Sequence, residues 1–254
     1  MEAIINPRII LLLLSSLITA LVIILVPHVS QDPAYHNFAD QRYISGIPHF
    51  WNVVTNIPFI LLGITGFFKI QKQELPGILP DLFRAYLAFF MGLVLTGLGS
   101  GYYHLDPSNS TLVGDRMAIT ISFMSFFVLI FGESISTKTA SRLLAPLLLF
   151  GLASVVYWNI TEKIGTGDLR FYALVQFLPM LLIPLMLLFY GSCLSGRRWI
   201  LAIILVYGAA KITEMYDHQI YELIGFSGHS LKHLIAAFGA FLFLKGLEVR
   251  KPIK

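Results

Sequence analysis

Long apolar segments alternate with short polar ones along almost the whole chain. Each apolar segment has roughly 17 to 22 residues, enough for a helix to cross a hydrocarbon layer of about 30 Å. The pattern predicts an all-α, polytopic membrane bundle. Composition agrees, with 13% charged residues against about 25% in soluble proteins. We expect eight spans: Ile9 to Val26, Phe50 to Phe68, Leu82 to Tyr103, Asp115 to Ser134, Leu143 to Trp158, Phe171 to Tyr190, Trp199 to Met215 and His229 to Leu247.

The first apolar segment starts close after Arg8, as in a signal peptide. It is long for such a peptide, and no small-x-small cleavage site follows it. We therefore expect an uncleaved helix. The predicted organisation is an N-terminal transmembrane helix with an outer loop over residues 1–48, followed by a seven-helix membrane domain over residues 49–254.

Lysine and arginine residues fall mainly on one side of the predicted spans. Twelve lie on the side that holds both termini, and four lie on the other. By the positive-inside rule both termini are cytoplasmic, which accounts for the net charge of +4 without a nucleic-acid partner. The two groups are Arg8, Lys69, Lys72, Arg84, Lys138, Arg142, Arg197, Arg198, Lys245, Arg250, Lys251 and Lys254, against Arg42, Arg116, Lys163 and Arg170.

Polar side chains that suit chemistry gather at the outer ends of three spans. Ser100 and His104 end the third span, Asp115 opens the fourth, and His229 and His233 open the eighth. Residues four apart share a helix face. Ionisable groups at membrane depth are costly and are usually functional. We therefore expect these side chains to form one site near the outer face.

Three imidazoles from two helices can hold one metal ion. Three histidines with an open fourth position are typical of catalytic zinc, whereas structural sites use four protein ligands. A single histidine near a helix end is more often only hydrogen-bonded, and a receptor with structural zinc or a transporter would use the same residues. An open coordination position beside Asp115 and Ser100 favours a catalytic role. The apolar inner halves of these spans argue against transport.

Other polar residues have plainer interpretations. Asn52 and Asn56 are expected to hydrogen-bond between helices. Lys211 and Glu214, three residues apart, are expected to pair. His218 lies in a predicted outer loop without a ligand partner four residues away, so we do not expect it to bind metal.

Three segments together resemble the alkaline ceramidases, part of a superfamily of seven-helix membrane hydrolases that includes the adiponectin and progestin receptors. They read "GLGSGYYHLDPSNSTLVGDRMA", "GHSLKHLIAAFGAF" and "FWNVVTNIPFILLG". The family pattern is Ser-x3-His ending one helix, Asp opening the next and His-x3-His opening the last. The resemblance implies zinc on His104, His229 and His233, with Asp115 as general base. Ser100 would donate a hydrogen bond to the oxyanion or to the zinc-bound water.

The implied reaction is hydrolysis of the N-acyl bond of ceramide or a related lipid, because zinc makes water a nucleophile near neutral pH. The sequence leaves open another acyl lipid, either an ester or an N-acyl amine, and a non-enzymatic receptor. Calcium dependence is doubtful, since the segment before "FWN" keeps only Asp40 as a carboxylate and calcium needs six to eight oxygens. A bacterial cytoplasmic membrane is the expected location.

Overall fold

Helices make up nearly all of the regular structure in the part of the chain that is described. The computed structural model describes the backbone of residues 7–253 and the side chains of residues 13–253. The helices are α1 (Pro7–Leu25), α2 (Phe50–Val54), α3 (Ile57–Gln71), α4 (Phe83–Leu105), α5 (Asn109–Ser134), α6 (Thr137–Lys163), α7 (Arg170–Phe189), α8 (Arg198–Met215), α9 (Asp217–Ile224) and α10 (Gly228–Val249), with short 3₁₀ turns η1 (Pro33–His36) and η2 (Pro80–Leu82).

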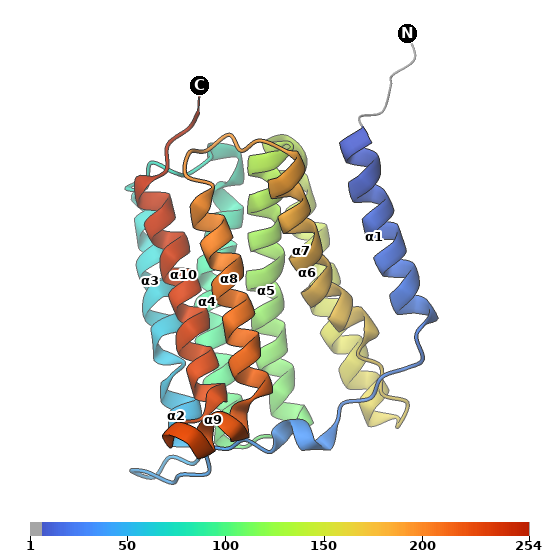
Figure 1. Ribbon diagram of the computed structural model, residues 1–254, viewed down its shortest axis with the longest axis vertical. Coiled ribbons are helices and arrows are strands. Elements are labelled where there is room, and N and C mark those ends of the chain that lie inside the picture. The colour runs from blue at the N-terminus through green and yellow to red at the C-terminus, as the bar shows by residue number, and fades with distance from the viewer. Residues whose placement is uncertain (1–6, 254) are drawn as a thin grey trace.

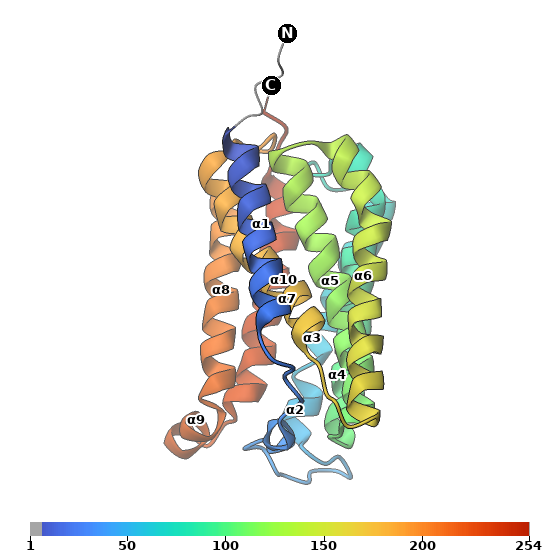
Figure 2. The same cartoon turned by 90° about the vertical axis from the view of Figure 1, so that its right-hand side faces the viewer.

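The long helices run roughly side by side in one bundle (Figure 1). Helix α5 packs against α4, α6 and α7, while α10 packs against α8 and α3. Helix α1 lies outside this arrangement and contacts α7, as Figure 2 shows. The beginning of α1 and the end of α10 lie at one end of the bundle, and α2 and α9 lie at the other (Figure 1).

The predicted all-α membrane bundle is confirmed. Six helical segments are long and apolar enough to cross a membrane, and α8 with α9 makes a seventh if that bent pair is one span. Within the described side chains of α1, Leu13–Leu25 forms a shorter apolar helix. An eighth span over Ile9 to Val26 therefore remains a prediction.

One predicted span is broken, and another is followed by a sharp bend, near the end of the bundle that holds α2 and α9. The span from Phe50 divides into α2 and α3 at Thr55 and Asn56. Pro58 follows this break, and its missing N–H removes the helical bond to the carbonyl four residues earlier. At Tyr216 the chain bends by 81° between α8 and α9, so the segment that we expected to be a loop is a short helix.

Aromatic side chains fill the centre of the bundle between α4 and α10. Tyr86, Phe90 and Phe243 are almost fully buried there. Gly66 of α3 lies directly against the ring of Phe90, so a side chain at position 66 would overlap that ring. Small residues let helices approach closely in membranes, where packing drives helix association because the lipid is as apolar as the core.

Arg170 joins α1 to the rest of the bundle. Its Nη1 donates to the carbonyls of Ile24 at 2.9 Å and Val26 at 2.8 Å, which satisfies acceptors left free at the end of a helix. Its Nε donates to Asp168 Oδ1 at 2.8 Å. Hydrogen bonding to Arg170 lowers the pKa of the Asp168 carboxyl to about 2, so this pair is charged at neutral pH.

Candidate metal centre

The predicted site residues lie at one end of the bundle, on three neighbouring helices. Ser100 and His104 occupy the last two turns of α4, Asp115 lies in the second turn of α5, and His229 and His233 open α10. Gly99 lets α4 approach α5 closely, because a Cβ there would lie 2.9 Å from the carbonyl oxygen of Gly114. The structure thus places all five residues at one end of the bundle, and their roles stay a prediction.

The three histidines form one compact, buried cluster. Ring centroids of His104 and His229 are 4.9 Å apart, those of His104 and His233 are 5.1 Å apart, and those of His229 and His233 are 4.9 Å apart. Each ring offers one nitrogen, and these nitrogens lie within 4.8 Å of one another. Among the described residues, this is the group that could hold a metal ion.

Thr55, at the break between α2 and α3, orients the ring of His233. Its hydroxyl donates to the carbonyl of Trp51 at 2.6 Å, and the same oxygen lies 3.0 Å from Nδ1 of His233. With its own proton used, the oxygen accepts the N–H of Nδ1. The other ring nitrogen, Nε2, then keeps its lone pair, as a metal ligand requires.

Asp217 fixes the start of α10 and thereby the position of His229. Its Oδ1 accepts from the Ser227 hydroxyl at 2.6 Å and from the backbone N–H of His229 at 2.9 Å. Ser227 caps the helix by accepting from the N–H groups of His229 and Ser230, both at 3.1 Å. These bonds use donors that a helix start leaves free, so the first turn of α10 is held in one orientation.

Phe38, from the segment before α2, covers the cluster. Its ring centroid is 4.6 Å from that of His104 and 4.4 Å from that of His229. The next residue is anchored, because the N–H of Ala39 donates to Asp217 Oδ2 at 2.9 Å. The side chain of Phe38 is itself buried, so it closes the histidine cluster on this side.

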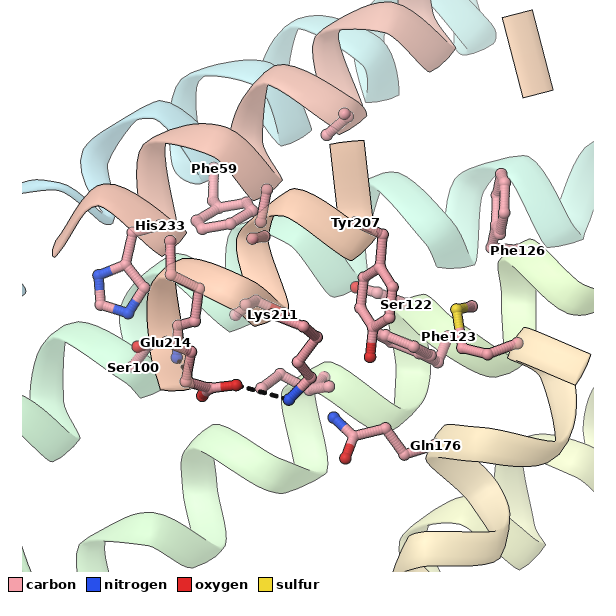
Figure 3. Close-up of a pocket in the computed structure, with 18 of the residues that line it drawn as sticks. Phe59, Ser100, Ser122, Phe123, Phe126, Gln176, Tyr207, Lys211, Glu214 and His233 are labelled. Atoms are coloured by element: carbon pink, nitrogen blue, oxygen red, sulfur yellow. Dashed lines mark hydrogen bonds and ion pairs between the residues drawn. The ribbon is translucent and has the colours of Figure 1, made fainter. Parts of the chain in front are cut away.

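A cavity of about 360 Å³ opens beside the histidines and extends into the bundle. Ser100, Asp115 and His233 line its polar end, and rings such as Phe59, Phe89 and Phe126 line the remainder. Figure 3 shows Ser100 and His233 at one side of the pocket and Phe126 at the other. The cavity thus combines polar groups near His233 with an apolar interior suited to an apolar ligand.

The donor set fits a metal ion better than a purely structural role for the histidines. Nδ1 of His104 and Oδ1 of Asp115 are buried and have no hydrogen-bond partner. Buried polar atoms rarely remain unpaired without a functional reason. His233 lines the cavity, and three imidazoles leave room for a further ligand, as catalytic metal sites require.

The carboxylate of Asp40 is used by protein donors. Oδ1 accepts from Arg42 Nε at 2.7 Å, and Oδ2 accepts from the N–H of Trp51 at 2.8 Å. His49 donates its Nδ1–H to the Asp40 carbonyl at 2.7 Å. The cationic partner of this buried acid is therefore a side chain of the protein, and calcium independence stays a prediction.

Asn52, Lys211 and His218 make contacts of the kinds expected for residues outside the metal centre. Oδ1 of Asn52 accepts from the Ser230 hydroxyl at 2.6 Å, joining α2 to α10. Lys211 and Glu214 pair at 2.6 Å. His218 stays outside the cluster and contacts the carbonyl of Asn37 at 2.9 Å.

Sequence reasoning missed Thr55, Phe38 and Asp217. Each reaches the site from a segment that no periodic pattern links to it, and each contacts a residue far away in sequence. A helix-break signal at Pro58 marks the neighbourhood of Thr55 but not its partner. Asp217 lies ten residues before the helix-capping Ser227. No spacing rule in the sequence predicts a contact between two such residues.

Comparison with known proteins identifies the family of the chain. Residues 36–251 match the family model described as Ceramidase, a range that contains all five predicted site residues. Alkaline ceramidase 3 of Mus musculus is 27% identical over 133 residues, covering 50% of this chain and 47% of that protein. The chain thus spans about half the length of this relative in the alignment. Because the family model covers most of the chain, the protein belongs to the Ceramidase family.

Proposed function

We propose that the protein is a zinc-dependent intramembrane amidase that hydrolyses the N-acyl bond of ceramide or a related sphingolipid. The products are a free fatty acid and a sphingoid base. The observation that carries the proposal is the buried cluster of His104, His229 and His233, of which His233 lines an apolar cavity together with Asp115. Membership of the Ceramidase family supports the same reaction class.

His104, His229 and His233 are the proposed metal ligands. A bound zinc ion would polarise the carbonyl and activate a water molecule near neutral pH. Thr55 supports this assignment, because its hydrogen bond to Nδ1 leaves Nε2 of His233 free to act as a ligand. The chain has one cysteine, Cys193, which lies outside the cluster, so thiolate ligation does not compete.

Asp115 is the proposed general base and acid. In hydrolysis the water oxygen bonds to the acyl carbon, the C–N bond breaks, and the leaving nitrogen gains a proton. Asp115 takes a proton from the water and returns it to that nitrogen. Its unpartnered Oδ1 is available for this transfer. Ser100, which lines the same end of the cavity, is proposed to donate its hydroxyl to the oxyanion.

Substrate is proposed to enter from the membrane rather than from the outer solution. Phe38 covers two of the three histidines on the side of the α2 and α9 end. The cavity instead extends between apolar side chains of the membrane-spanning helices. A lipid would place its acyl chain among Phe59, Phe89 and Phe126 and its amide at the histidines.

The predicted sidedness places the site near the outer face with both termini in the cytoplasm, in a bacterial cytoplasmic membrane. The start of α1 and the end of α10 share one end of the bundle, opposite to α2 and α9. The positive-inside rule assigns the termini to the cytoplasm. The division into an N-terminal transmembrane helix with an outer loop over residues 1–48 and a seven-helix hydrolase domain over residues 49–254 is likewise proposed.

Purified protein provides the test. We expect one zinc per chain by elemental analysis, and release of fatty acid from ceramide in detergent micelles. Replacing His233 by alanine should remove both the zinc and the activity. The matched control is His218→Ala, a histidine at the same end of the bundle that contacts only a backbone carbonyl, and it should keep both.

Two chelators distinguish dependence on zinc from dependence on calcium. Activity should survive a calcium-selective chelator and should be lost with a zinc chelator. Protein without zinc, or normal zinc in the His233→Ala variant, would contradict the metal assignment. If ceramides are inert while acyl esters or N-acyl amines are cleaved, the protein is a related hydrolase of a different lipid.

A further inference from the structure

Two lysines share one carboxylate on the wall of the cavity, next to the histidine cluster. Lys211 and Glu214 lie on α8, and Lys232 lies on α10. The Glu214 carboxylate pairs with Lys211 at 2.6 Å and with Lys232 at 2.9 Å. Figure 3 shows the Lys211–Glu214 pair projecting into the pocket, between His233 on one side and Tyr207 on the other.

The charges on the cavity wall do not balance. Asp115 and Arg116 also line the cavity, and their formal charges cancel. One carboxylate, Glu214, remains for two ammonium groups, which leaves one positive charge. An uncompensated charge at membrane depth is costly and usually marks a functional site. A metal ion on the histidines would add further positive charge at the same end.

Both lysine side chains line the cavity and are only partly buried. Side-chain exposure is 33% for Lys211 and 20% for Lys232, against 16% for Glu214. Neighbouring polar groups add donors, since Gln176 and Tyr207 line the same wall. The hydroxyl of Tyr207 is buried without a hydrogen-bond partner. An unpaired buried hydroxyl needs a partner, and in this position a ligand would supply one.

The positive charge of Lys232 lies close to the proposed metal ligands. Its Nζ lies 3.0 Å from Nε2 of His229. This nitrogen has a single lone pair, so it binds either the ammonium group or a metal ion. Metal binding through Nε2 would therefore release Lys232 toward the cavity, where Glu214 is already shared with Lys211.

We propose that Lys211 and Lys232 form an anion-binding subsite for the polar part of the substrate. The substrate class would be N-acyl lipids, anionic relatives of ceramide included, that carry a carboxylate, sulfonate or phosphate close to the scissile amide. The position beside the histidines assigns the anion to the head of the lipid, because the apolar end of the cavity is left for the acyl chain. This inference rests on the proposed amidase function and specifies its substrate.

A pair of lipids that differ mainly in charge tests the proposal. N-oleoylglycine and N-oleoylethanolamine share the acyl chain and the amide, and differ in having a carboxylate or a hydroxymethyl group. We expect kcat/KM to be at least about tenfold higher for N-oleoylglycine, the range expected of a charged hydrogen bond. Lys211→Met should remove this preference by lowering the value for N-oleoylglycine alone.

Two further variants make the result specific. Lys211→Arg keeps the positive charge and should restore most of the preference. Lys163→Met removes an exposed lysine outside the cavity and should leave both substrates unchanged. Equal rates on the two lipids, or an unchanged preference in Lys211→Met with normal zinc content, would overturn the subsite.

Binding gives a readout that does not require hydrolysis. With an Asp115→Asn background, equilibrium dialysis in micelles should show N-oleoylglycine bound about tenfold more tightly than N-oleoylethanolamine, and Lys211→Met should abolish the difference. If neither lipid is hydrolysed but this difference is found, the subsite stands and the proposed amidase function fails. If Lys211→Met weakens only the binding of oleate, the lysines hold the fatty-acid product and the proposal is wrong.

Discussion

The hydroxyl oxygen of Thr55 lies 3.0 Å from Nδ1 of His233, across 178 residues of sequence. Because the Thr55 proton is donated to the carbonyl of Trp51 at 2.6 Å, the oxygen can only accept from the imidazole. One hydrogen bond therefore selects the tautomer in which Nε2 is free. It also ties the break between α2 and α3 to the metal centre.

The first prediction concerns this bond. Thr55→Val keeps the shape of the side chain but removes the acceptor, so zinc affinity should fall by about 10- to 100-fold, as for other partners of metal-bound histidines. Thr55→Ser retains the hydroxyl and should bind zinc nearly normally. Competition with a chromogenic chelator measures both affinities. Equal affinities in the valine and serine variants would refute the orienting role.

The second prediction separates proton transfer from metal binding. Asp115→Asn should keep the fold and most of the zinc while losing about 10² to 10⁴ in rate, the contribution of a general base. Elemental analysis and a fatty-acid release assay on the same sample measure the two properties. Full turnover by the asparagine variant would contradict the proposed mechanism while leaving the zinc site intact.

Removal of the Ser100 hydroxyl should be milder than loss of the Asp115 carboxylate. Ser100→Ala removes one proposed donor to the oxyanion, which should lower kcat by roughly 10² to 10³ with zinc retained. The same release assay measures this change. An unaltered kcat would indicate that the Ser100 hydroxyl serves only the packing of α4.

Sidedness can be tested by cysteine labelling in intact cells. In a Cys193→Ala background, a Ser110→Cys variant should react with an impermeant thiol reagent, because Ser110 is exposed at the start of α5. An Ile253→Cys variant, 59% exposed at the opposite end, should react only after the cells are permeabilised. The reverse pattern would overturn the positive-inside assignment and place the site on the cytoplasmic side.

Acid should weaken the anchor of α1. Arg170 lowers the pKa of Asp168 to about 2, below the ordinary value near 4. A depressed carboxyl pKa stabilises the folded state above about pH 4, and this contribution is lost as the pH falls toward 2. Between about pH 4 and pH 2, the free energy of unfolding should depend less on pH in the Asp168→Asn variant than in the wild type. Asp106→Asn, at an exposed position, should retain the wild-type slope.

Much of the fold was determined by the sequence itself. Apolar segments of spanning length specify helices, because a backbone in lipid must satisfy its own hydrogen bonds. Ser108 caps the start of α5, and Pro58 follows the break in the second span, as local chemistry dictates. The spacing of Ser100 with His104 and of His229 with His233 already places each pair on one helix face. The alternation of spans then brings those pairs to the same end of the bundle.

Only the tertiary structure decided how these parts meet. No spacing rule places Phe38 on the rings of His104 and His229, and none aims Asp217 at the N–H of His229. Such contacts depend on how neighbouring helices pack, and helix packing permits a range of angles and registers for the same apolar pattern. The pairing of Glu214 with Lys232 across two helices likewise follows from register. The sequence thus specifies which groups reach the site, whereas packing specifies which atoms face one another.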